Sequence, residues 1–322
     1  MFIVKYIPAW FLSYFYRLRP QQNDHELVFV LPGDAGTWIL GAICREIAAH
    51  TTMKTHFHYQ TSQIPKAKYY FFAHYSLYFS ALKRNPALWS RKCFVFHTHP
   101  KDLGITDSEF AFVMNRSSKI IQMCSSFQPE LEKRGVNAER LAVVVGGGAD
   151  PKLFKSHVRR GRTVGFCTAF YERKNPDRIF DLIRSLQDYE FILIGRHWDK
   201  YARFNEMRSL SNFKYYEVEY AQYPALYAQM DVFVAPSELE GGPIPLLEAM
   251  MSNVMPVACI TGFAPDIIVD GKNGYLFPSG STADHIAGLI RKAVANETDV
   301  NDSIKYLDWE YFTKQIEGIL TA

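Results

Sequence analysis

Short apolar segments alternate with helical segments along most of this chain, and this alternation restricts the fold more than any other feature. Apolar runs begin near residues 27, 93, 117 and 141, and again near 164, 191, 215, 232 and 257. Strands that alternate with helices predict a parallel, doubly wound α/β sheet. The alternation restarts at residue 163, after a connector rich in glycine and basic residues. We therefore expect two Rossmann-like domains.

The length of 322 residues suits two domains of about 150 residues each. We divide the chain into an aromatic and basic extension, a first Rossmann-like domain, a second one and a closing helix, at residues 1–26, 27–160, 161–305 and 306–322.

Composition excludes several classes of function. A formal charge of +3 without a Lys/Arg block does not favour a nucleic-acid partner. The five cysteines are scattered and form no CxxC pair, so they predict small core residues in a reducing compartment. His97 and His99 have no matching pair of ligands, and no Asp-x-Asp motif is present, so we expect neither a metal nor a cofactor.

The segment 231–256 predicts a strand, a loop and a helix, with Glu240 in the loop and Glu248 in the helix. Pro245 near the first turn marks the helix start. Such a start offers free backbone N–H groups and a positive dipole end, which favour a phosphate. One carboxylate could then reach the group on the phosphate and the other a ribose hydroxyl. The alternative is a solvated loop glutamate and an ordinary helical one.

The motif EGGPIPLLEAM at 240–250, followed by PVACITGFAPDIIVDGKNGYLF at 256–277, resembles the family 4 retaining glycosyltransferases, which have the GT-B fold. Further matching segments follow the family order: LPGDAGTWILGAICREIA, FVFHTHP, VVVGGGADPKLF, GFCTAFYERKNPDRI and YLDWEYF. The resemblance covers roughly residues 27–318. It implies two facing Rossmann-like domains with a cleft between them, and a last helix that crosses back to the first domain.

The resemblance also assigns the cations of the site. Lys174 matches the lysine that binds the donor phosphates. The family usually has an arginine five positions earlier, where this chain has Ala169. Arg173 and Arg196 are the candidates that compensate for this missing charge.

In the glycine loop, Gly242, Pro243 and Ile244 match the donor-binding backbone. Pro243 replaces a common glycine and has no N–H, which leaves Gly242 and Ile244 as donors. By the same resemblance Glu240 touches the sugar near its anomeric centre, and Glu248 binds the ribose.

The first domain supplies the remaining candidates. Gly36 allows a close backbone approach to the donor. His97 matches a histidine that contacts the donor sugar or lies near the acceptor, and a structural histidine is the alternative. His99, Asp34 and Asp266 are lesser candidates.

The resemblance implies a metal-independent retaining glycosyltransferase that moves a sugar from a nucleotide diphosphate sugar to a glycan or lipid-linked acceptor. The alternative is a non-catalytic GT-B protein that binds nucleotide sugar or scaffolds another transferase, with Ala169 and Pro243 in its favour. A nucleotide-binding dehydrogenase is set aside because the loop PGDAG lacks the G-x-G-x-x-G fingerprint.

Residues 1–19 carry seven aromatic residues together with Lys5, Arg17 and Arg19. Pro8 and the short length argue against a membrane-spanning helix. The segment could lie flat on a membrane surface, or pack on its own domain or on a second subunit of a homodimer. We therefore expect a cytoplasmic protein, with peripheral attachment to the inner face of the membrane as one alternative.

Overall fold

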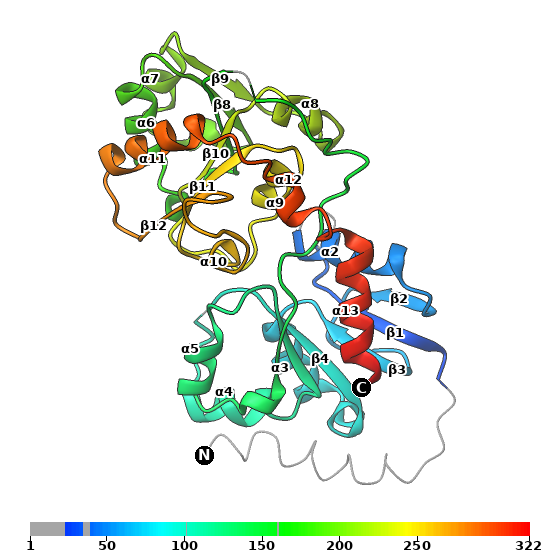
Figure 1. The fold of residues 1–322 in the computed structure, drawn as a ribbon. Coiled ribbons are helices and arrows are strands. Elements are labelled where there is room, and N and C mark those ends of the chain that lie inside the picture. Colours follow the sequence, from blue (N-terminus) through cyan, green and yellow to red (C-terminus); the bar gives the residue numbers. More distant parts are fainter. Residues whose placement is uncertain (1–22, 35–38, 101, 160) are drawn as a thin grey trace. The chain divides into compact units, whose positions relative to one another are not determined.

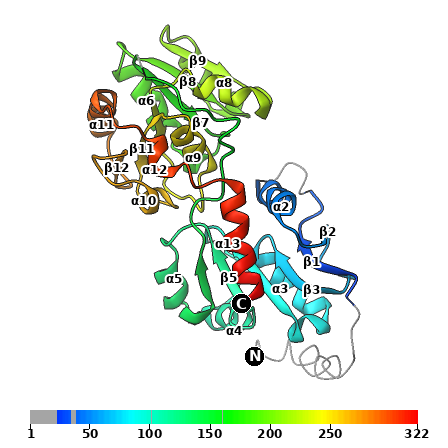
Figure 2. The same ribbon diagram turned by 45° about the vertical axis from the view of Figure 1, so that its right-hand side comes forward.

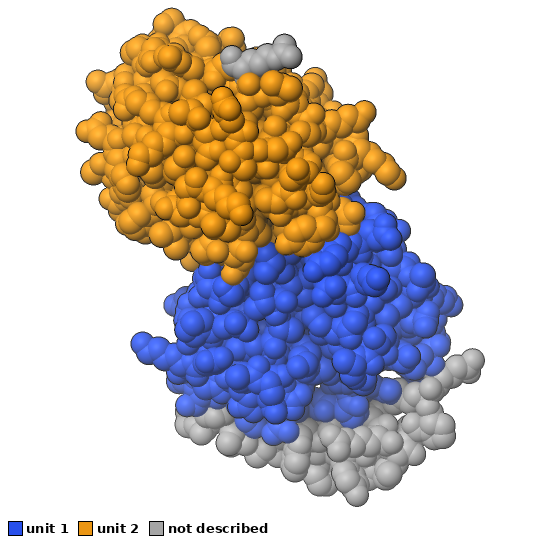
Figure 3. Space-filling view, in the orientation of Figure 1, with its two compact units in different colours: residues 1–145, 309–322 blue, residues 146–308 orange. Residues whose placement is uncertain are grey.

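The computed structural model describes all residues except 1–22, 35–38, 101 and 160. The chain divides into two compact units (Figure 3). The first comprises Met1–Val145 and Trp309–Ala322, and the second Gly146–Asp308.

The first unit is built on a six-stranded sheet with the order β2-β1-β3-β4-β5-β6 (Figure 1). Every pair of neighbouring strands in it is parallel. The strands are β1 His25–Val30, β2 Thr55–His58, β3 Ala67–Phe72, β4 Lys92–His97, β5 Lys119–Gln122 and β6 Leu141–Val143. The sheet confirms the predicted parallel, doubly wound arrangement.

Helices cover this sheet, and their apolar residues close the core. They are α2 Ile39–His50, α3 Tyr75–Arg84, η3 Pro86–Ser90, α4 Asp107–Met114, α5 Gln128–Lys133, η4 Ala138–Arg140 and α13 Trp309–Thr321. Phe72, Tyr75, Val95 and Phe110 belong to one buried cluster. In Figures 1 and 2 the C-terminal helix α13 lies beside α2, and the two helices are in contact. The closing helix therefore belongs to the first unit.

The second unit repeats this architecture with the strand order β12-β11-β10-β7-β8-β9. Its strands are β7 Thr163–Cys167, β8 Glu190–Ile194, β9 Phe213–Tyr216, β10 Val232–Ala235, β11 Met255–Cys259 and β12 Tyr275–Phe277. All its strand pairs are parallel too. The chain proceeds in one direction from β7 and in the other from β10. The boundary between these two strands is thus the topological switch point, where such sheets bind ligands at their carboxyl ends.

The helices of the second unit are η5 Glu172–Lys174, α6 Pro176–Ser185, η6 Trp198–Lys200, α7 Phe204–Arg208, η7 Tyr220–Gln222, α8 Tyr223–Tyr227, α9 Ile244–Met251, α10 Ala264–Ile267, α11 Ala283–Ala295 and α12 Asn301–Ile304. Helix α6 illustrates the local logic. It begins with Pro176, and Ile179, Phe180 and Ile183 form a buried stripe at helical spacing.

The connector after β6 packs with the second unit, so the change of unit falls earlier than the sequence boundary at 160/161. The Ala149 N–H donates to the Leu307 carbonyl (3.3 Å). Phe154 is buried against the ring of Tyr227 at 5.5 Å between centroids. Although this connector is rich in glycine and basic residues, its apolar residues Ala149 and Phe154 are buried in the second unit.

All five cysteines are free thiols, and four of them are buried. They serve as small core residues, as the sequence predicts. In the part of the chain that the structure describes, no helix combines the length and the apolar character needed to cross a membrane.

Candidate functional site

Glu240 is the centre of a charged cluster at the switch point of the second sheet. It follows β10, and only 9 % of the residue is exposed. Its carboxylate forms an ion pair with the ammonium of Lys174, which lies in the turn η5 after the neighbouring strand β7. The guanidinium of Arg173 lies 3.5 Å from the second carboxylate oxygen. The structure thus brings together three residues that the sequence assigned to one site.

Hydrogen bonds between the loops after β7 and β10 fix this cluster. Arg173 donates from its guanidinium to the Leu239 carbonyl (2.6 Å), and its own carbonyl accepts from the Glu238 N–H (3.3 Å). Asn175 donates from its side-chain amide to the Pro236 carbonyl (2.9 Å). Asn175 has a left-handed backbone with φ of 54°, a conformation that asparagine tolerates better than most residues. The charged side chains therefore stand on two braced loops.

The electrostatics of Glu240 follow from its burial and its partners. Burial alone would raise its pKa, but the charges of Lys174 and Arg173 and a hydrogen bond from Lys174 lower the pKa below its ordinary value. Glu240 therefore stays ionised at neutral pH, and one carboxylate faces two cations.

A third loop, which follows β11, closes against Glu240. The Thr261 hydroxyl accepts a hydrogen bond from the Glu240 N–H (3.1 Å). Gly262 has φ of +55°, and a Cβ there would lie 3.1 Å from both the Glu240 Cβ and the Pro243 Cδ. Only glycine suits this place because a side chain would crowd the loop and would also strain the backbone. Asp266, on the short helix α10, is exposed.

Helix α9 begins directly after the glycine loop, as expected. Pro243 is its N-cap, and the Leu246 N–H donates to the Pro243 carbonyl (2.8 Å). The Ile244 N–H donates to the Gly242 carbonyl (3.0 Å). In this structure the turn takes up the N–H of Ile244, and the role of Ile244 as a donor to the nucleotide sugar stays a prediction. The Gly242 N–H, by contrast, donates to no group in the described part of the chain.

Glu248 lies one turn into α9 and is 2 % exposed. Each of its carboxylate oxygens accepts a hydrogen bond from a tyrosine: Tyr220 at 2.7 Å and Tyr227 at 3.1 Å. Burial raises the pKa of Glu248 to about 7, although both tyrosine hydrogen bonds act to lower it. Glu248 is thus a buried acid that changes charge near neutral pH.

The loop after β8 lies against the position of the missing arginine. Thr168 donates from its N–H to the Ile194 carbonyl (2.8 Å), and Phe170 donates to the Arg196 carbonyl (3.0 Å). The backbone of Arg196 is thereby tied to that of the residue after Ala169. The Arg196 side chain is exposed. This placement keeps Arg196 as a candidate for the missing cation.

In the first unit, His97 ends strand β4 and is 1 % exposed. It stacks on Tyr75 at 5.1 Å between ring centroids. Burial, with smaller contributions from neighbouring basic groups, lowers the pKa of His97 to about 3, so the ring is neutral. Its Nδ1 has no hydrogen-bond partner in the described part of the chain. The structure therefore makes His97 a neutral polar group at the carboxyl edge of the sheet.

Three candidates of the first unit remain, and the structure describes two of them. His99 is half-buried, with Nδ1 3.3 Å from the Thr98 hydroxyl, and Asp34 is exposed. Gly36 lies outside the described residues.

Sequence reasoning missed several residues that complete these contacts. Tyr220 and Tyr227 hold Glu248, and Thr261 holds the backbone of Glu240. Gln122 lies opposite His97 in the parallel register of β5 and β4. It is fully buried, and its side-chain amide has no partner among the described residues. No motif marks these residues, although Gln122 as a polar end to an apolar strand was a visible signal.

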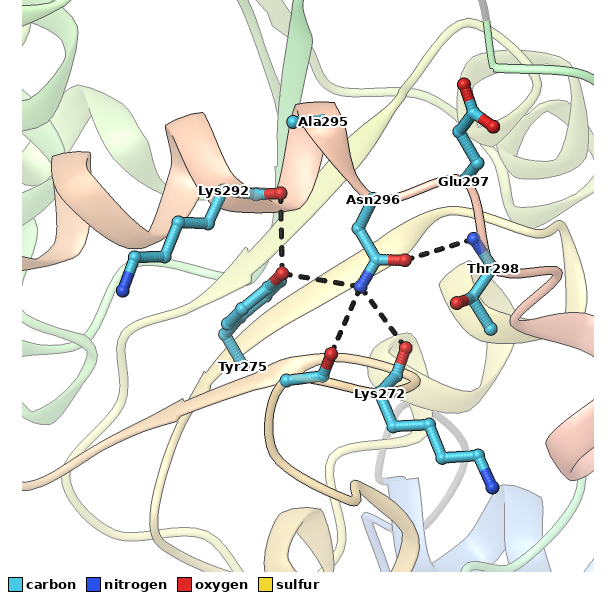
Figure 4. A pocket seen from close by; sticks show the side chains of 8 residues that line it. Lys272, Tyr275, Lys292, Ala295, Asn296, Glu297 and Thr298 are labelled. Atoms are coloured by element: carbon cyan, nitrogen blue, oxygen red, sulfur yellow. Dashed lines mark hydrogen bonds between the residues drawn. The ribbon is translucent and has the colours of Figure 1, made fainter.

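A surface hollow lies elsewhere in the second unit, between β12 and the end of α11 (Figure 4). Asn296 donates there to the carbonyls of Gly271 (3.4 Å) and Lys272 (3.2 Å). The side chain of Asn296 thus ties two loops together. Among the described residues, no group of three or more His, Cys, Asp or Glu side chains could hold a metal ion.

Residues 150–308 match the family model described as glycosyl transferases group 1. A sulfoquinovosyl transferase of Arabidopsis thaliana is 39 % identical over 107 residues, which cover 29 % of this chain and 20 % of the relative. A phosphatidyl-myo-inositol mannosyltransferase of Mycobacterium leprae is 26 % identical over 195 residues, or 56 % of this chain and 50 % of the relative. The chain thus spans half the length or less of these two curated relatives.

The fold also resembles solved structures. Anabaena HepE in complex with UDP and glucose gives a TM-score of 0.72 at 16 % identity, with 92 % of this chain and 99 % of that chain covered. A sucrose-phosphate synthase from Thermosynechococcus elongatus gives 0.73 at 12 % identity, with 92 % and 98 % covered. These similarities confirm the GT-B fold.

Proposed function

We propose that this chain, whose residues 150–308 match the family model of glycosyl transferases group 1, transfers a sugar from a nucleotide diphosphate sugar to a glycan or lipid-linked acceptor. The cluster of Lys174, Arg173 and Glu240 at the switch point is the observation that carries the proposal. Support comes from the UDP found with Anabaena HepE and from the activities in the names of the relatives.

The proposed chemistry follows from where charge develops. When the anomeric C–O bond breaks, the leaving phosphate gains negative charge, and fixed cations and N–H groups stabilise it. Lys174 and Arg173 would face that phosphate, and the Gly242 N–H would donate to it. Glu240 would lie near the anomeric centre, and Glu248 would take the ribose hydroxyls. In the first unit, the neutral ring of His97 would form one hydrogen bond with a sugar hydroxyl, either as donor or as acceptor.

We further propose a retaining reaction that needs no metal. The leaving phosphate would then take the proton of the acceptor hydroxyl on the face that it leaves. Analysis of the product's anomeric configuration by NMR tests retention. Assays with and without EDTA test the metal, and a loss of activity in EDTA that Mg²⁺ restores would overturn that part.

The decisive experiment measures nucleotide release from UDP-, GDP- and ADP-sugars, with and without extracted glycan and lipid acceptors. Acceptor-dependent release by the wild type, and its loss in Lys174→Ala, would support the enzyme. The non-catalytic alternative has specific support: Ala169 removes a cation, Pro243 lacks an N–H, and the Ile244 N–H is already bonded. This alternative predicts that the chain binds a nucleotide sugar but releases no nucleotide, whichever acceptor is added.

We also propose a cytoplasmic location with peripheral attachment to a membrane through residues 1–19. Their aromatic and basic composition supports this proposal, since such segments bind anionic interfaces. The same segment could instead join two copies of the chain. Light scattering of the full chain and of a chain without residues 1–19 distinguishes a homodimer contact from a lipid contact.

A further inference from the structure

The burial of Glu248 conflicts with its proposed role in binding a ribose. A carboxylate that binds ribose hydroxyls must be reachable, yet Glu248 is 2 % exposed. One side chain that covers it belongs to the surface: Tyr220 is 51 % exposed and still donates to a Glu248 oxygen at 2.7 Å. A side chain that reaches the surface thus holds one of the two carboxylate oxygens of Glu248.

The two tyrosines on Glu248 differ in their surroundings. Tyr227 lies in helix α8, is fully buried, and packs on Phe154 and Phe233. Its hydroxyl also lies 3.3 Å from the Pro245 carbonyl. Its position is therefore fixed by the core of the second unit.

Tyr220, in contrast, begins the three-residue turn η7 and follows three residues that belong to no helix or strand. Its ring lies 5.3 Å from Tyr223 and 6.1 Å from Phe154, between centroids. Tyr220 thus reaches the carboxylate from a short turn at the surface, whereas Tyr227 reaches it from the core.

We propose that Tyr220 is a gate whose hydroxyl occupies the place of a ribose hydroxyl on Glu248 and leaves when a ribonucleoside diphosphate binds. Tyr227 is the positioning residue that keeps the carboxylate aimed at that place. The inference rests on the proposed function, because it takes a nucleotide sugar as the ligand. The Tyr220 hydroxyl and a ribose hydroxyl each donate an O–H to the same carboxylate oxygen. The exchange therefore replaces one hydrogen bond by another of the same kind and is reversible.

The test is the affinity of the full chain for UDP, GDP and ADP, each titrated separately at pH 8.5, where Glu248 is ionised. Tyr220→Phe keeps the ring and removes the hydroxyl. The nucleotide no longer competes with a hydrogen bond, so Kd should fall about two- to tenfold. Tyr227→Phe is the matched control, since it removes the other hydroxyl from the same carboxylate. It should give no gain in affinity.

Stopped-flow binding gives a second measure. If opening of Tyr220 precedes binding, the observed rate for the wild type should level off as nucleotide rises, and Tyr220→Ala should remove this limit. Equal or weaker affinity in Tyr220→Phe, with normal binding by the wild type, would overturn the gate alone. Absence of nucleotide binding by the wild type would instead overturn the proposed function. Thermal melting of each variant confirms that it is folded.

Discussion

Glu248→Gln should change how the stability of the second unit depends on pH. The pKa of Glu248 lies at about 7 in the folded chain, against an ordinary value of 4.5, because burial disfavours its charge. The folded chain therefore keeps a proton that the unfolded chain releases. This stabilising contribution is complete below pH 4.5 and is lost as the pH rises through about 7.

The size of the effect follows from the shift. At roughly 1.4 kcal/mol per pKa unit, a rise from 4.5 to about 7 corresponds to about 3 kcal/mol. A unit the size of Gly146–Asp308 loses roughly 2–4 °C in melting temperature per kcal/mol. Between pH 4.5 and 8, the wild type should therefore lose roughly 6–12 °C relative to Glu248→Gln. Glutamine cannot ionise, so the second unit of the Glu248→Gln variant lacks this pH-dependent contribution to stability.

Differential scanning calorimetry of both proteins over this pH range makes the measurement. Glu240→Gln is the control of opposite sign, because cations lower the pKa of Glu240. Its ion pair stabilises at neutral pH, and that contribution is lost as the pH falls through the folded pKa. A difference between wild type and Glu248→Gln that stays constant from pH 4.5 to 8 would refute the reasoning.

Two further predictions follow from the geometry of the site, and a third from the composition of residues 1–19. Lys174→Ala should lower turnover on the order of a hundredfold while nucleotide affinity changes less, because the charge matters most as the phosphate leaves; near-normal turnover would place the diphosphate elsewhere. Gly262→Ala should reduce activity strongly, because its Cβ would crowd Glu240, whereas Gly280→Ala, also at positive φ but with open space around it, should keep activity at a similar cost in melting temperature. Deletion of residues 1–19 should abolish flotation with anionic vesicles and leave nucleotide binding unchanged; retained flotation would contradict a lipid anchor there.

The sequence was enough to predict most of the fold because hydrophobic alternation determines it locally. Both parallel sheets and helix α9 lie where apolar runs and Pro245 indicated. The aromatic sequence near residues 69–82 is compatible with a strand or a helix, and the segment contains both, β3 and then α3. Only pairing with a neighbouring strand can decide such a run, since a short apolar segment fits either structure.

The site was predictable where a motif carries it and not where tertiary contacts do. Glu240 and Lys174 were identified by their motifs, and they form an ion pair across two loops. The sequence around Tyr220 does not predict its hydrogen bond to Glu248, which lies 28 residues later in the chain. The hydrogen bond from the Ile244 N–H to the Gly242 carbonyl was not predictable for a similar reason, because the geometry of a turn, not its sequence, decides which N–H stays free.

The charge balance at the switch point leads to a last prediction. Lys174 and Arg173 face a single carboxylate, so the unliganded cluster carries a net positive charge. A diphosphate would add negative charge to it and compete with Glu240 for the same cations. Glu240→Gln should therefore bind nucleoside diphosphates more tightly, while sugar transfer falls because the sugar loses its carboxylate partner. Calorimetric titration with UDP, beside a turnover assay, separates the two effects. A parallel loss of affinity and turnover would mean that Glu240 positions the cations for the phosphate instead of competing with it.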